Sequence, residues 1–212
     1  MRRLVNALLA LSMVAAAGYG PGVAAADGPA RLMVLGDSLS AGFGLPREQS
    51  FPVRLEAALK ARGLAVEVVN ASVSGDTTAG GLARLDWATD AARPNFAIVE
   101  LGANDALRGL DPRQAFDNLE RIVARLAQRG VKVLLAGMAA PPNLGGDYGR
   151  EFDSMYPRLA AKHGVPLYRF FLDGVAADPA LNQPDGLHPN ARGVDVIVER
   201  ILPSVLRLVG GS

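Results

Sequence analysis

Four short apolar runs lie along the chain, separated by longer segments in which apolar and polar residues recur at helical intervals. The runs are mostly aliphatic or β-branched, are bounded by Gly, Asn or Pro, and cover residues 32–35, 66–69, 96–101 and 131–136. Runs of this length and composition are typical of strands that are buried on both faces of a sheet. Residues 165–170 are a candidate fifth strand.

The segments between these runs predict helices. Phe51, Leu55 and Leu59 share one helical face, after Ser50 as a candidate cap and with Pro52 as an early proline. Further helices are expected at residues 78–91, 111–126, 149–163 and 191–208. Strands that alternate with helices indicate a parallel sheet covered on both faces, because each crossover must return to the same edge. The predicted fold is therefore α/β, a three-layer αβα sandwich with a flavodoxin-like parallel sheet of about five strands.

The first 26 residues have the pattern of a secretory signal peptide. A basic start, Met1-Arg2-Arg3, precedes a mostly apolar segment, and Ala24-Ala25-Ala26 offers small residues before Asp27. The apolar segment, residues 4–18, is shorter than the roughly 20 residues of a spanning helix. We expect export to the periplasm or the medium after cleavage near Ala26, with residues 27–212 forming a single domain and no stable membrane span.

Composition and charge exclude several classes of protein. The chain has 212 residues, of which 50% are hydrophobic, so one domain with a sizeable core is expected. Lys and Arg total 22 against 21 Asp and Glu, and this near-neutral balance argues against nucleic acid as a partner. The absence of cysteine excludes disulfides, thiolate metal sites and a cysteine nucleophile.

Small polar residues follow three of the predicted strands, in residues 36–40, 70–77 and 102–105. The carboxyl ends of parallel strands meet at one edge of a sheet, so these segments are expected to converge there. Taken singly, Ser38 could be a helix cap, Asn104 a turn residue and Asp185 a partner of its own loop. Their joint occurrence, with His188 downstream, indicates a functional site instead of three separate turn or cap residues.

A serine nucleophile needs a base to take its proton, and the base needs an acceptor for its other nitrogen. Asp185 and His188, three residues apart across a Gly-containing turn, can supply that pair next to Ser38. Gly75 allows close backbone approach and Asn104 supplies an amide, both of which suit stabilisation of an oxyanion. The Gly-x-Ser-x-Gly elbow of α/β-hydrolases does not occur in the sequence.

Four sequence blocks resemble those of the SGNH (GDSL) hydrolase superfamily and occur in the family's order. They are Gly36-Asp37-Ser38-Leu39, Gly75-Asp76, Gly102-x-Asn104-Asp105 and Asp185-x-x-His188. Residues 70–85, 100–109 and 185–190 are also similar to the bacterial exported thioesterase/arylesterase/lysophospholipase subgroup. The resemblance implies an SGNH-type fold and hydrolysis of carboxylic acyl esters and thioesters through an acyl-enzyme.

The same resemblance implies a role for each matching residue. Ser38 would be the nucleophile, His188 the general base and later acid, and Asp185 the group that orients the imidazole. The N–H groups of Ser38 and Gly75 and the amide of Asn104 would form the oxyanion hole. No metal or organic cofactor is implied. The expected partner is a small acyl ester or thioester, with lysophospholipid as one candidate, and the expected state is a monomer.

The sequence also offers several candidates for contacts with the substrate. The candidates are Val73, Leu107, Arg108, Leu110 and Pro142. The apolar candidates fit ordinary packing in the core as well as they fit the lining of a substrate groove. Arg108 likewise fits a solvated surface position as well as it fits a contact with the substrate. Residues 141–149 are read as a loop slightly longer than expected for the subgroup, which leaves the acyl chain-length preference open.

Two other functions fit parts of the pattern. A non-catalytic module could cradle a phosphate in the Ser, Thr and Gly loops, although His188 would then have no purpose. Alternatively, Asp37, Asp76, Asp105 and Asp185 could bind Mg²⁺ or Ca²⁺, although they lack regular ligand spacing. The resemblance instead makes Asp37, Asp76 and Asp105 acceptors that brace the loops.

Overall fold

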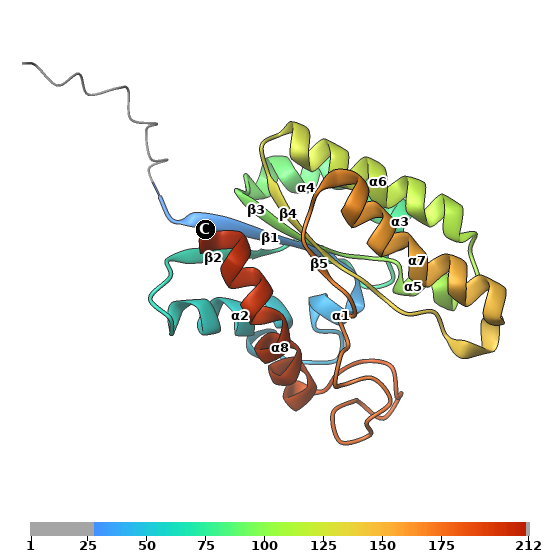
Figure 1. The fold of residues 1–212 in the computed structure, drawn as a ribbon. Helices are drawn as coiled ribbons and strands as arrows, with labels where there is room; N and C mark the ends of the chain where they lie inside the picture. Colours follow the sequence, from blue (N-terminus) through green and yellow to red (C-terminus); the bar gives the residue numbers. More distant parts are fainter. Residues whose placement is uncertain (1–27, 211–212) are drawn as a thin grey trace, which may run out of the picture.

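A five-stranded parallel sheet forms the centre of the molecule (Figure 1). The structure, a computed structural model, describes residues 28–210, so the expected signal peptide lies outside the described residues. The strands are β1 (Ala30–Gly36), β2 (Val66–Asn70), β3 (Phe96–Glu100), β4 (Lys132–Ala136) and β5 (Leu167–Tyr168). Their order is β2-β1-β3-β4-β5, and every neighbouring pair is parallel. The predicted αβα sandwich is confirmed.

Helices cover both faces of the sheet (Figure 1). Helices α2 (Phe51–Lys60) and α8 (Ala191–Gly210) pack against each other on one face. The other face carries α3 (Thr78–Ala83), α4 (Leu85–Ala92), α6 (Pro112–Gln128) and α7 (Gly146–His163). Shorter pieces are α1 (Ser38–Ala41), α5 (Ala103–Leu107) and the 3₁₀ turns η1 (Arg47–Gln49) and η2 (Pro142–Leu144).

The central strands carry the core. Residues 32–35 of β1 and 97–99 of β3 are completely buried, because each strand has a neighbour on both sides and helices on both faces. The prediction that residues 66–69 are buried on both faces is wrong. They are only partly buried, because β2 is an edge strand.

Two predicted segments differ from the structure. The single helix expected at residues 78–91 is interrupted at Arg84, whose backbone (φ −101°, ψ 4°) leaves the helical region and separates α3 from α4. The loop expected at residues 141–149 is instead the turn η2 followed by the start of α7 at Gly146. Local glycines and prolines suggested a loop there, but the helix extends through Gly146 and Gly149 nonetheless.

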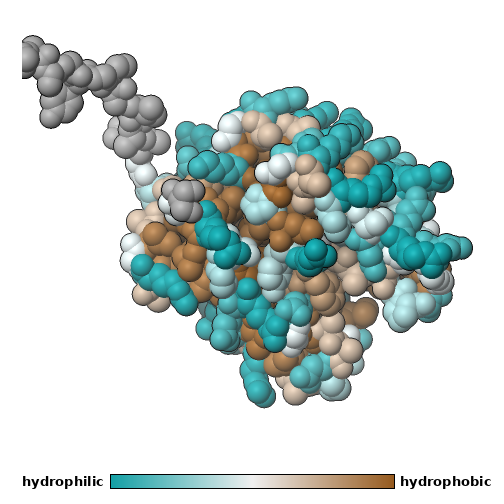
Figure 2. All heavy atoms as spheres, viewed as in Figure 1, coloured by the Kyte–Doolittle hydropathy of each residue, from teal (hydrophilic) through white to brown (hydrophobic). Residues whose placement is uncertain are grey.

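Hydrophilic residues are spread over the face of the molecule seen in Figure 2, with hydrophobic residues gathered between them. The exposed large apolar side chains of the described residues are Phe43, Val53, Val73, Trp87, Leu107, Leu110 and Leu187. Within residues 28–210, none of the helices combines the length and apolar character needed to cross a bilayer.

Candidate active site

The ends of β1, β2 and β3 come together at one edge of the sheet, as the sequence predicted. In the strand register, Gly36 is paired with Glu100 and Val34 with Asn70, so the three strands finish at nearly the same level. The segments that follow them therefore converge, although they are far apart in sequence. Gly36 must be a glycine because an added Cβ would collide with Ser40 Oγ and the Glu100 carboxylate.

A hydrogen-bonded chain of Ser38, His188 and Asp185 lies at this edge. Ser38 Oγ is 2.9 Å from His188 Nε2, and His188 Nδ1 is 2.7 Å from Asp185 Oδ2. Ser38 opens α1, while the other two residues lie in the loop between β5 and α8. The fold thus brings together groups that are separated by 150 positions in the sequence.

The Asp185 carboxylate is fixed by its own turn. Its Oδ1 accepts hydrogen bonds from the N–H groups of Leu187 (2.9 Å) and His188 (3.0 Å), which leaves Oδ2 for the imidazole. These N–H groups, together with the His188 ring, lower the pKa of Asp185 to about 2. The group is therefore an acceptor at neutral pH. With Nδ1–H donating to it, a neutral imidazole presents Nε2 as the acceptor for the Ser38 hydroxyl.

Gln183 and Phe43 support His188 and were not found by sequence reasoning. Gln183 N donates to His188 O (2.8 Å), and its side-chain Nε2 donates to Phe43 O (2.7 Å). The Phe43 ring lies 4.6 Å from the His188 ring, centroid to centroid. Because Gln183 and Phe43 are 140 positions apart, no local sequence signal predicts this contact.

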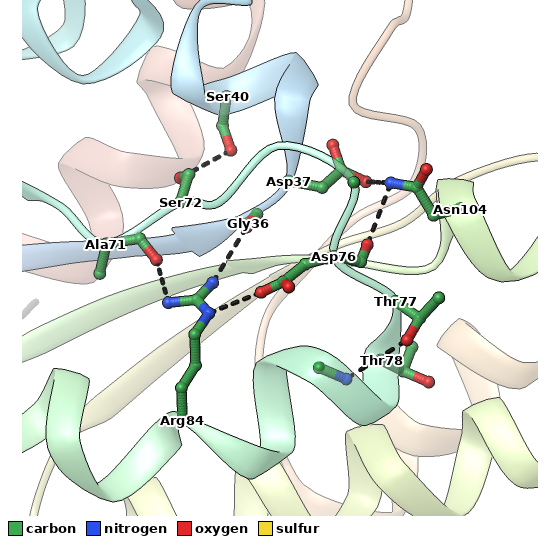
Figure 3. Close-up of polar contacts among 12 residues, drawn as sticks. Gly36, Asp37, Ser40, Ala71, Ser72, Asp76, Thr77, Thr78, Arg84 and Asn104 are labelled. Carbon is green, nitrogen blue, oxygen red and sulfur yellow. Dashed lines mark hydrogen bonds and ion pairs between the residues drawn. The ribbon is translucent and has the colours of Figure 1, made fainter.

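The groups expected to form an oxyanion hole lie beside Ser38. Asn104 Nδ2 donates to Asp76 O (3.0 Å) and to Asp37 Oδ2 (3.2 Å), and Figure 3 shows both bonds. Gly75 has φ +86°, a left-handed conformation that favours glycine. Within the described part of the chain, the N–H groups of Ser38 and Gly75 donate no hydrogen bond. Both therefore remain available to a ligand.

A cavity of about 570 Å³ opens beside these groups. Ser38, Gly75, Asn104 and His188 all lie on its wall. Its larger apolar lining residues are Leu39, Phe43, Leu107, Met138, Phe170, Leu172 and Leu187. Apolar walls with a few convergent polar groups are typical of a small-molecule site.

Of the five predicted substrate contacts, Leu107 lines the cavity. The others are not among its lining residues: Val73, Arg108, Leu110 and Pro142. Arg108 Nη2 instead donates to Gly75 O at 2.9 Å. Of residues 141–149, which the sequence analysis linked to the acyl chain-length preference, Pro141 lines the cavity, whereas the lining residues 138–140, which follow β4, were missed.

Two of the aspartates considered as cation ligands, Asp76 and Asp105, accept hydrogen bonds from protein donors. Asp76 accepts from Arg84 Nε at 2.5 Å, and Asp105 accepts from Thr78 N (2.8 Å) and Thr78 Oγ1 (2.6 Å). The expectation that Asp76 and Asp105 brace the loops is confirmed. Across residues 28–210, no group of three or more His, Asp or Glu side chains is arranged to hold a metal ion.

Asp37 and Glu100 form a buried pair of carboxyl groups behind Ser38. Both are completely buried. Asp37 Oδ1 accepts from Leu39 N at 3.0 Å, which confirms its bracing role, and Glu100 Oε2 accepts from Ser40 Oγ at 2.6 Å. Burial raises the pKa of Asp37 to about 6. Burial, and then the charge of Asp37, raise the pKa of Glu100 well above its usual range.

These shifts predict how stability depends on pH. A carboxyl group whose pKa is higher in the folded protein stabilises the fold at low pH, and this contribution is lost as pH rises through the folded pKa. For Asp37 this window extends from about pH 4 to pH 6, and for Glu100, whose pKa is also raised, it runs upward from the ordinary value of 4.5. We expect Glu100→Gln to lose less of its free energy of unfolding across that window than the unsubstituted protein does.

Urea unfolding at several pH values measures this difference. Glu67→Gln is the matched control, because Glu67 lies on the edge strand β2 with a side chain that is 42% exposed. The control should follow the unsubstituted protein. If Glu100→Gln also followed it between pH 4 and pH 6, Glu100 would not contribute to the pH dependence.

A parallel αβα sandwich with a serine, histidine and aspartate hydrogen-bonded beside a cavity has the architecture of a serine hydrolase. The chain belongs to the GDSL-like Lipase/Acylhydrolase family, whose sequence pattern matches residues 34–196. That range contains Ser38, His188 and Asp185. The resemblance to the SGNH (GDSL) superfamily is therefore confirmed.

Named relatives match most of the chain. An arylesterase from Vibrio mimicus is 40% identical over 87% of this chain and 92% of its own length. The thioesterase 1/protease 1/lysophospholipase L1 of Escherichia coli K12 is 40% identical over 79% of this chain and 77% of its own length. The crystal structure of AlinE4, an SGNH-hydrolase family esterase, is 48% identical with a TM-score of 0.72, over 84% of this chain and 96% of that one.

Proposed function

We propose that this chain is a serine hydrolase that cleaves carboxylic acyl esters and thioesters, with Ser38 as the nucleophile. One observation carries the proposal. Ser38 Oγ lies 2.9 Å from His188 Nε2, whose ring is held at 2.7 Å by an ionised Asp185. A serine hydroxyl needs this arrangement of base and orienting carboxylate to become nucleophilic near neutral pH.

In the acylation step, Ser38 Oγ attacks the carbonyl carbon of the substrate while His188 Nε2 accepts the hydroxyl proton. The carbonyl oxygen becomes negatively charged and accepts hydrogen bonds from the N–H groups of Ser38 and Gly75 and from the amide of Asn104. When the tetrahedral intermediate collapses, the bond to the alcohol or thiol breaks. The leaving group takes the proton from His188, and the acyl group stays on Ser38.

In the deacylation step, water takes the place of the leaving group. His188 removes a proton from this water, the resulting oxygen nucleophile attacks the acyl carbon, and the same donors hold the oxyanion. Collapse releases the carboxylic acid, and Ser38 Oγ recovers its proton from His188. Asp185 stays ionised throughout and balances the charge of the imidazolium.

Asn104 is held in advance of this reaction. Its amide nitrogen already donates to Asp76 O (3.0 Å) and Asp37 Oδ2 (3.2 Å), so it is not free to rotate. In the proposed mechanism the longer bond, to Asp37, is shared with or exchanged for the oxyanion. The bond to Asp76 O is kept throughout, so the amide stays in place and the reorganisation is confined to one hydrogen bond.

The substrate class is supported by the cavity and by the relatives. A volume of about 570 Å³ with largely apolar walls suits an acyl chain, since small-molecule pockets span roughly 300–1,000 Å³. The relatives are named arylesterase and thioesterase 1/protease 1/lysophospholipase L1, which supports esters, thioesters and lysophospholipid as candidate substrates. We also propose that residues 1–26 are a signal peptide that directs export, and that the mature chain acts as a monomer.

Labelling by a p-nitrophenyl alkylphosphonate tests the proposal. Ser38 Oγ should displace p-nitrophenolate and form a bond to phosphorus. One phosphonate per protein molecule should then abolish hydrolysis of a chromogenic short-chain ester. Mass spectrometry of peptides locates the label, and excess ester should protect against it. A label on another residue in fully inactivated protein would contradict the proposal. A parallel sample with chelator should keep its rate, and a chelator-sensitive rate would instead favour a metal-dependent reaction.

A further inference from the structure

The side chain of Arg84 points from the break between α3 and α4 toward the ends of the strands (Figure 3). It is only 17% exposed. Its three nitrogens each have an acceptor: Nε is 2.5 Å from Asp76 Oδ2, Nη1 is 2.5 Å from Ala71 O, and Nη2 is 3.2 Å from Gly36 O. Every nitrogen of the guanidinium group therefore makes a contact within the protein.

Each acceptor lies in a segment that carries a residue of the proposed oxyanion hole. Gly36 is two residues before Ser38, at the end of β1. Ala71 begins the segment that leads from β2 to Gly75, and Asp76 follows Gly75 directly. The carbonyl of Asp76 also accepts from Asn104 (3.0 Å), so the third donor is linked to the same set.

An arginine suits this position better than any other cation. Its planar guanidinium carries five N–H donors in fixed directions and stays charged, whereas lysine offers one ammonium on a flexible stem. The charge is balanced by Asp76, which has the same 17% exposure. Loss of the guanidinium would remove this donor from the part-buried carbonyl of Ala71 and leave Gly36 O with Val73 N alone (3.0 Å), so the two segments would no longer be tied to Asp76 through one group.

We propose that Arg84 is a positioning residue for the oxyanion hole. It sets the relative placement of the Ser38 N–H, the Gly75 N–H and the Asn104 amide without touching the substrate. The inference rests on the proposed function, because the three donors have a common purpose only in acyl transfer. Donors of this kind must be held within about 0.5 Å of the productive geometry, so a small relaxation of the loops has a large effect on rate.

Substitution of Arg84 by methionine and by lysine tests this inference on the full chain. Arg31 provides the matched control, because Arg31 Nε pairs with Glu67 (2.9 Å) and Nη1 donates to Ala92 O (3.2 Å), near the start of β1. We expect Arg84→Met to lower kcat for a chromogenic ester about 10- to 100-fold with KM changed less than about twofold. Arg84→Lys should recover part of the loss, and Arg31→Met should keep its kcat.

Combination with Asn104→Ala separates positioning from general destabilisation. Asn104→Ala alone should lower kcat about 10²- to 10³-fold. If Arg84 acts through the same oxyanion hole, the double variant should lose less than the product of the two single losses. Multiplicative losses, or a kcat for Arg84→Met equal to that of Arg31→Met, would overturn the inference. Should Arg84→Met fail to fold, Arg84→Lys, which keeps the charge opposite Asp76, is used in the cycle instead.

Ser38→Ala in the same assay distinguishes the two possible failures. If Ser38→Ala keeps its activity, the proposed function is wrong, and the positioning role is overturned with it. If Ser38→Ala is inactive while Arg84→Met and Arg84→Lys match the Arg31 control, the proposed function stands and only the role of Arg84 is overturned.

Discussion

Ser38→Ala is expected to lower kcat for ester hydrolysis by about 10⁴- to 10⁶-fold while the protein stays folded. The substitution removes the hydroxyl that lies 2.9 Å from His188 Nε2 and that, in the proposed mechanism, attacks the carbonyl carbon of the substrate. It leaves the backbone N–H groups of the proposed oxyanion hole unchanged. Alanine is also a good residue for the start of α1, so little stability should be lost. Initial rates with a chromogenic ester, together with a thermal unfolding curve, measure both effects.

Ser40→Ala is the control for this substitution. Ser40 lies two residues further on in α1, is completely buried, and its hydroxyl contacts Glu100 (2.6 Å) and Ser72 (2.9 Å), not His188. Its loss should cost about 1–3 kcal/mol of unfolding free energy and less than tenfold in kcat, because it leaves buried partners unsatisfied but removes no reacting group. A Ser38→Ala protein that kept more than a few per cent of its activity would rule out Ser38 as the nucleophile.

His188→Gln is expected to cause a loss of similar size, about 10⁴- to 10⁶-fold in kcat. Glutamine can form hydrogen bonds with Ser38 and Asp185 but can neither accept nor return a proton at neutral pH. The double variant with Ser38→Ala should be no slower than either single variant, because residues that act as a unit do not contribute additively. Steady-state rates of the three proteins under one set of conditions test this expectation.

His163 offers a matched control, because it is the other of the two histidines in the chain. It lies at the end of α7, where its Nε2 is 3.8 Å from Glu120 Oε1. His163→Gln should therefore keep its full rate. A loss in His163→Gln comparable with that in His188→Gln, or a double variant far slower than both single variants, would contradict the proposed roles.

Much of the fold could be predicted from the pattern of apolar residues. The central strands β1, β3 and β4 are continuous apolar runs because they are covered on both faces. The pattern could not show that β2 lies at an edge, since its valines have the same local appearance and strand order depends on contacts between distant segments. The break at Arg84 was missed for the same reason, because the contacts of its side chain are made with Gly36, Ala71 and Asp76.

The residues of the candidate site could be predicted where reactive side chains follow a strand or lie close together in the sequence. Ser38 and Asn104 follow strands directly, and Asp185 and His188 form a local pair, so short stretches of sequence indicated all four. Gln183 and Phe43 could not be found in this way, because their contact spans 140 positions. The cavity wall at residues 170–177 follows β5, which is only two residues long and gives a weak signal in the sequence.

The wall of the cavity and the Ser38, His188 and Asp185 chain come from different parts of the polypeptide. Residues 138–141 and lining residues within 170–177 form much of the apolar surface, yet none of them belongs to that hydrogen-bonded chain. Larger or smaller side chains there would change the length of acyl group that fits while leaving the proton transfers intact. Chain-length selectivity can thus be altered at the cavity wall separately from the groups proposed to carry out the chemistry.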